Sequence, residues 1–81
     1  MKVRERLFAV ARQLAGAEAI DLELPERATV GQLRRELVAR LPQLAPLVSH
    51  LALAVDSSYA GDDLEISPGA EVACIPPVSG G

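Results

Sequence analysis

One amphipathic segment, residues 30–41, constrains the fold of this chain more than any other feature. Thr29 is a favoured helix N-cap, and Gln32 stands three positions later, where the partner of a capping box belongs. Pro42 then ends the helical pattern. The pattern predicts one main helix with a single apolar stripe, formed by Val30, Leu33, Leu37, Val38 and Leu41. The side chains expected on its solvent face are Arg34, Arg35 and Arg40.

Four strand-like patterns surround this helix, at residues 3–8, 19–24, 51–55 and 71–75. Residues 51–55 are apolar on both faces, which is typical of a strand inside a sheet. A short helix, Ala9–Ala15, is expected after the first strand, with Gly16 just past its end. Residues 43–50 are expected to form a short helical turn or a packed loop, and residues 67–70 a type II turn.

Glu5 is the awkward residue of the first strand. Alternation places it on the same face as Val3 and Leu7, which are apolar. A carboxylate is costly inside a core. The fold can accommodate Glu5 if this residue reaches the edge of the sheet.

The order of these elements predicts an α+β fold of the β-grasp, or ubiquitin-like, type. This fold has a mixed sheet of four to five strands, with one main helix packed on one face. We expect the first and last strands to lie side by side, in parallel, at the centre of the sheet. The 81 residues suffice for one small domain. We assign residues 1–75 to the β-grasp domain and residues 76–81 to an extended tail.

Composition and charge exclude several classes of protein. The net charge of -3 argues against binding to nucleic acid, and the absence of a long apolar run argues against a membrane span. The start of the chain does not resemble a signal peptide, so we expect a cytoplasmic location. Cys74 is the single cysteine and His50 the single histidine, so no metal site is expected. We expect Cys74 to be buried in the core and His50 to lie at the surface, while Asp62, Asp63 and Glu65 form a solvated acidic turn.

The segment after the last strand carries the candidate chemistry. Pro76 and Pro77 favour an extended backbone that rises about 3.1 Å per residue. Gly80 and Gly81 lack Cβ atoms and can pass through a narrow channel. We expect the chain to end at Gly81, whose carboxylate can be presented to a pocket on another protein. Once activated as an acyl-adenylate, its carbonyl would accept a sulfur or amine nucleophile.

Residues 71–81, EVACIPPVSGG, resemble the C-terminus of the small, sulfur-carrier subunit of molybdopterin synthase. That family typically ends in Pro-Pro-Val-Ser/Thr-Gly-Gly, after two aromatic or apolar residues. The resemblance extends to residues 7–9, 29–30 and 53–55, which match the first strand, the main helix and the middle strand of the family. Cys74 and Ile75 depart from the pattern, because the family often has aromatic residues there, and a smaller apolar contact with the partner is implied.

The resemblance implies a defined cycle. An adenylating partner enzyme would activate the Gly81 carboxylate with ATP, and a sulfur-donating protein would lead to a Gly81 thiocarboxylate. The large catalytic subunit of molybdopterin synthase would then use this sulfur on cyclic pyranopterin monophosphate, within a heterotetramer. This chain would bind no cofactor permanently and would not be catalytic alone. The residues expected to contact these partners are Ile75, Pro76, Pro77, Val78, Ser79 and Gly80.

Three alternatives stay open on the sequence. The chain could carry sulfur for thiamine or cysteine synthesis, because those carriers share the fold and the terminal Gly-Gly. It could be a ubiquitin-like protein modifier, whose activated carboxylate meets a lysine amine. Lys2 is the single lysine, so self-linked chains would have one side-chain acceptor. It could also be an interaction module with an idle tail.

Overall fold

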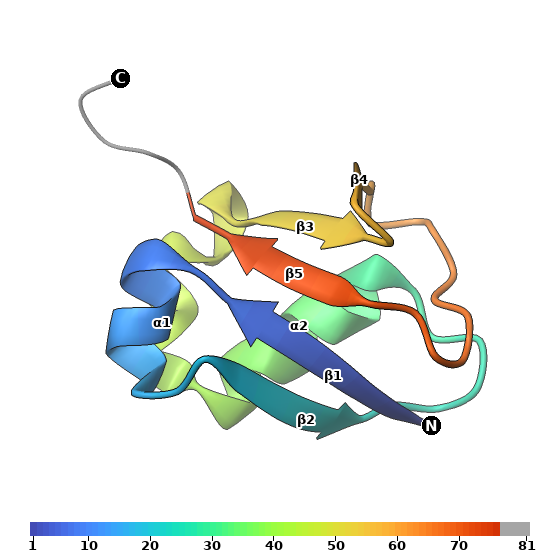
Figure 1. The fold of residues 1–81 in the computed structure, drawn as a ribbon, viewed down its shortest axis with the longest axis horizontal. Coiled ribbons are helices and arrows are strands. Elements are labelled where there is room, and N and C mark those ends of the chain that lie inside the picture. The colour runs from blue at the N-terminus through green and yellow to red at the C-terminus, as the bar shows by residue number, and fades with distance from the viewer. Residues whose placement is uncertain (77–81) are drawn as a thin grey trace.

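The last strand lies inside a five-stranded sheet in the computed structural model, which describes residues 1–76 (Figure 1). The strands are β1 (Lys2–Leu7), β2 (Ala19–Glu23), β3 (Ala52–Val55), β4 (Ser58–Tyr59) and β5 (Val72–Ile75), in the spatial order β2-β1-β5-β3-β4. β5 runs parallel to β1 and antiparallel to β3, while β1 and β2 are antiparallel. The central parallel pair predicted from the sequence is therefore confirmed, and the arrangement is a β-grasp.

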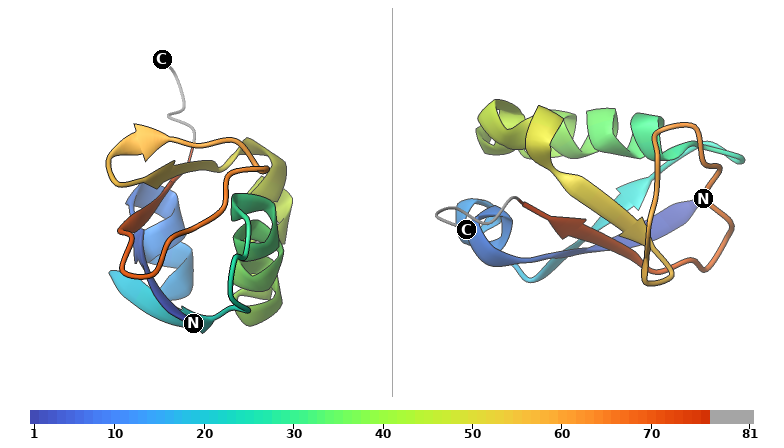
Figure 2. Two further views of the ribbon diagram at one scale, coloured as in Figure 1. Left: turned by 90° about the vertical axis from the view of Figure 1, so that its right-hand side faces the viewer. Right: turned by 90° about the horizontal axis from the view of Figure 1, so that it is seen from above.

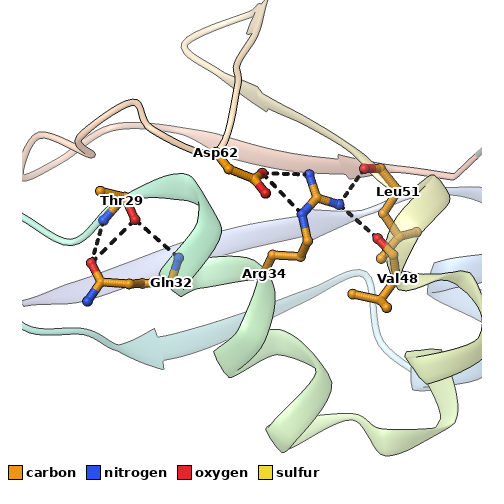
Figure 3. A network of polar contacts seen from close by, with 6 residues as sticks. All are labelled: Thr29, Gln32, Arg34, Val48, Leu51 and Asp62. Carbon is orange, nitrogen blue, oxygen red and sulfur yellow. Dashed lines mark hydrogen bonds and ion pairs between the residues drawn. The ribbon is translucent and has the colours of Figure 1, made fainter.

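The main helix, α2 (Val30–Arg40), lies across one face of this sheet (Figure 2). Its capping box is present, because the Gln32 backbone N–H donates to Thr29 Oγ1 (3.3 Å) and the Thr29 backbone N–H donates to Gln32 Oε1 (2.8 Å) (Figure 3). The side chains of Val30, Leu33 and Leu37 in α2 are buried between the helix and the sheet. The helix predicted from the amphipathic stripe is confirmed to within one residue at its end.

Two shorter helices complete the structure. α1 (Ala9–Ala15) follows β1 and ends at Gly16, whose φ of 72° is the left-handed conformation that glycine adopts without strain. η1 (Pro42–His50) is a 3-10 helix that follows α2. Within residues 1–76 the opposite face of the sheet has no helix over it (Figure 2). In the described part of the chain, no helix is long and apolar enough to cross a membrane.

The core between α2 and the sheet is aliphatic, since the chain contains one Phe, one Tyr and no Trp. Its largest fully buried side chains include Leu7, Leu22, Leu33, Leu37, Leu44, Leu53 and Ile66. The turn predicted at residues 67–70 also forms. The Ala70 N–H donates to the Ser67 carbonyl (3.1 Å) around Gly69, which has a φ of 82° and so completes a type II turn.

Two charged residues lie where the sequence pattern does not place them. Glu5 does not reach the sheet edge, because β1 is flanked by β2 and β5, and its side chain is 0% exposed. Arg34 does not face solvent, because its side chain lies against η1 and is 19% exposed. Arg35 and Arg40 are exposed, as expected.

Candidate functional site

The candidate site is the end of β5, from which the predicted tail departs. Ile75 is half-buried and stands opposite Ala52 of β3, and Pro76 is buried. The remaining predicted site residues lie outside the described residues: Pro77, Val78, Ser79, Gly80 and Gly81. The structure therefore locates the base of the predicted tail, and the roles of residues 76–81 stay predictions.

The end of β5 is held from two sides. On one side, the Phe8 backbone N–H, at the junction of β1 and α1, donates to the Cys74 carbonyl (3.3 Å). On the other side, β3 pairs with β5 from Ala52 to Val55. Because both neighbours are themselves strands of the sheet, Ile75 has a fixed position on the folded body.

Arg34 fixes the start of β3. Its Nη1 donates to the carbonyls of Val48 (2.9 Å) and Leu51 (2.6 Å), and its Nε and Nη2 donate to Asp62 Oδ1 (3.3 and 3.1 Å) (Figure 3). One guanidinium thus joins α2 to η1, to the residue before β3, and to the loop after β4. Since β3 pairs with β5, Arg34 supports the base of the predicted tail through one intervening strand.

A shallow depression of mixed polar and apolar lining lies on the uncovered face of the sheet, at the start of β5. In register across the sheet stand Arg6, Ala73, Ala54 and Tyr59, so their side chains share this face. The two alanines make its floor low, and a cavity of about 170 Å³ forms there, lined by Arg6, Phe8, Ala54, Ser57 and residues 71–73. The Arg6 guanidinium lies 5.6 Å from the centre of the Phe8 ring, which is 41% exposed.

A second, wider groove of about 960 Å³ lies over β1 and β2 and is lined by charged residues that include Lys2, Arg4 and Asp21. Arg4 and Asp21 form an exposed ion pair there (3.7 Å). The groove also reaches the turn at Gly69 that precedes β5. The smaller depression reaches residues 71–73 and the larger groove residues 69–72, so neither is lined by Ile75 or Pro76, and the candidate site stays at the end of β5 itself.

Cys74 is buried in the core, as predicted, and it is not a reactive thiol. Burial raises its pKa to about 12, and the nearby Glu5 contributes to the increase. A thiol with so high a pKa is protonated at neutral pH and is a poor nucleophile. The acidic turn is solvated, and its carboxylates form ion pairs, Asp62 with Arg34 and Glu65 with Arg27 (3.4 Å). Within residues 1–76, no cluster of three potential ligands is arranged to hold a metal ion.

Sequence reasoning missed Arg34 and Phe8. Arg34 lies four residues after Val30 and four before Val38, so helical spacing places it beside the apolar stripe, and this was a usable signal. Phe8 continues the alternation of Arg4 and Arg6 along the uncovered face. Its exposure depends on the strand order of the whole sheet, which the local pattern does not contain.

Comparisons with known proteins cover nearly the whole chain. Residues 6–81 match the ThiS family. The molybdopterin synthase sulfur carrier subunit of Arabidopsis thaliana is 35% identical over 81 residues, which are 100% of this chain and 84% of that protein. The protein of the same name from Caenorhabditis briggsae is 36% identical over 83 residues, covering 100% and 99% of the two chains.

A solved structure extends the likeness to three dimensions. The crystal structure of SAMP1, a small archaeal modifier protein from Haloferax volcanii, superposes with a TM-score of 0.89. It covers 100% of both chains, at 27% sequence identity. The resemblance and the β-grasp fold predicted from the sequence are both confirmed.

Proposed function

The chain belongs to the ThiS family, and on this premise we propose that it is the sulfur-carrying subunit of a molybdopterin synthase. The observation that carries the proposal is the full-length match to proteins of that name, which includes the segment after β5. The fixed position of the end of β5 supports the same role, because a carrier needs a rigid body from which its chain end can reach a distant centre.

In the proposed cycle, the Gly81 carboxylate is the reacting group. A carboxylate oxygen attacks the α-phosphorus of ATP on an adenylating enzyme, and pyrophosphate leaves. A sulfide-level sulfur supplied by a donor protein then attacks the carbonyl carbon, and AMP leaves with the oxygen. The product is a Gly81 thiocarboxylate. Glycine suits this chemistry because no side chain hinders the attack on its carbonyl.

The loaded carrier then docks on the large catalytic subunit, where cyclic pyranopterin monophosphate accepts the sulfur. Two such donations complete the dithiolene of molybdopterin. In this scheme the present chain is a co-substrate and not a catalyst alone, and ATP is consumed by its partner. Ile75, at the rim of the described body, and residues 76–80 beyond it are the proposed partner contacts. A cytoplasmic location stays a prediction.

Intact-mass measurement tests this proposal. The chain is incubated with an adenylating enzyme, ATP and a sulfur source, and we expect one oxygen-to-sulfur exchange at Gly81. Addition of the large subunit and the pterin precursor should reverse that exchange. Deletion of Gly81 should abolish the oxygen-to-sulfur exchange. The midpoint of thermal unfolding should change little, because chain termini generally contribute little to stability. A mass that never changes, with active partners present, would overturn the proposal.

A second candidate is a protein modifier, which the likeness to the archaeal modifier SAMP1 favours. Modification uses the same activated carboxylate, but a lysine amine takes the place of sulfur. The same experiment distinguishes the two functions, since a modifier would gain the mass of a target protein through an isopeptide bond. Lys2 offers one side-chain acceptor on the carrier itself.

A further inference from the structure

Glu5 is a carboxylic acid enclosed in an aliphatic core. Its side chain is 0% exposed, and within residues 1–76 neither carboxyl oxygen has a hydrogen-bond partner. In the sheet it stands between Ile20 of β2 and Val72 of β5, so no solvent-facing edge is near. A buried carboxyl without partners is strongly favoured in its neutral, protonated form.

The groups that face Glu5 do not change this preference. Arg34 approaches from α2, but its N–H groups are engaged by Val48, Leu51 and Asp62. Cys74 approaches from β5 and is itself protonated, and β2 presents the apolar Ile20. Burial raises the pKa of Glu5 to about 8, although the Arg34 charge acts in the opposite direction.

We propose that Glu5 makes the packing of α2 on the sheet proton-dependent, so that this layer opens locally when the carboxyl loses its proton. In the closed state the carboxyl is neutral and the aliphatic core surrounds it. In the open state water reaches the carboxyl and solvates its charge. The device is independent of the tail chemistry, because it resides wholly within residues 1–76.

Proton linkage determines how the local opening depends on pH. The closed state retains the proton up to about pH 8, whereas a hydrated glutamate loses it near its ordinary value of 4.5. Between pH 4.5 and about pH 8 the ratio of open to closed molecules rises about tenfold per pH unit, and above about pH 8 the ratio is constant. Near neutral pH, opening is therefore steeply sensitive to protons.

The Cys74 thiol can report on the local opening. It is the single cysteine, it is 0% exposed, and it shares the core face of the sheet with Glu5, since Leu7 pairs with Cys74 and Glu5 with Val72. Labelling with iodoacetamide, followed by mass spectrometry, measures how often this thiol becomes accessible. At low reagent concentration the rate follows the open population. Cys74→Ala should take up no label.

The test compares the full chain with its Glu5→Gln variant at each pH. The ionisation of the exposed thiol affects both proteins equally, so it cancels in the ratio of their rates. We expect the ratio of wild type to variant to rise about tenfold per pH unit toward pH 8 and then to level off. A ratio that does not change with pH overturns the proposal.

Two further measurements keep the test decisive. If Glu5→Gln does not fold, Glu5→Val is the reference, because valine fills a similar volume and suits a strand. Low concentrations of urea distinguish local opening from global unfolding, because local opening exposes less surface. A labelling rate with the full urea dependence of global unfolding would show that no local opening occurs.

Discussion

The contacts of Arg34 lead to a quantitative prediction about stability. Replacement by methionine keeps an unbranched apolar stem of good helix propensity and removes the guanidinium alone. The Val48 and Leu51 carbonyls, now 2.9 and 2.6 Å from Nη1, lose their charged donor. Each such bond contributes about 1.5 kcal/mol at the lower end of its range, which applies because the side chain is 19% exposed and water can partly replace it. The ion pair with the exposed Asp62 adds little.

We therefore expect Arg34→Met to lower the free energy of unfolding by about 3 kcal/mol. Urea denaturation followed by far-UV circular dichroism measures this loss, at a pH well below 8 so that Glu5 stays protonated in the folded state. Arg35→Met is the matched control, because Arg35 lies next in the same helix and is exposed. Asp62→Asn should have a small effect. The reasoning is refuted if Arg34→Met and Arg35→Met lose the same stability.

Two other perturbations test the core and the helix start. The free energy of unfolding should fall by about 5 kcal/mol as the pH rises from 4.5 to about 8, because the unfolded chain releases the Glu5 proton at lower pH than the folded chain does. Above pH 8 it should be constant. Urea titrations at several pH values should show this decrease in the wild type and not in Glu5→Gln. Gly31→Ala should destabilise by about 1 kcal/mol despite its better helix propensity, because its Cβ would lie 3.2 Å from Asp62 Cβ and 3.3 Å from the Asp62 carbonyl oxygen. Gly61→Ala, whose Cβ would meet nothing within 4 Å, is the control, and an equal loss in both variants contradicts this account.

Local patterns predicted much of this fold because each signal acts over a few residues. The capping box at Thr29, the stop at Pro42 and the turn at Gly69 depend on nearby backbone, and all three form as expected. Cys74 is buried in the core as predicted, and Val72, two residues earlier on the same face of β5, is buried with it.

The buried positions of Glu5 and Arg34 were not predicted, and the reason is the same for both. In an isolated helix or strand a charged side chain faces solvent. In the folded chain its position depends on the elements that pack against it. β5 closes over one side of β1 from the far end of the sequence, and the carbonyls that hold Arg34 come from η1 and the residue after it. The role of Ile75 was predicted from its place in the chain, whereas the depression formed by Arg6, Ala54 and Ala73 depends on the register of β1, β3 and β5.

The central position of β5 has a mechanical consequence. A force applied to the chain beyond Pro76 is directed along β5, whose ladders to β1 and β3 lie on either side. Such a load shears both ladders at once, and many hydrogen bonds resist it together, whereas a strand at the margin would peel away one bond at a time. The folded body can therefore keep its shape when a load acts along β5.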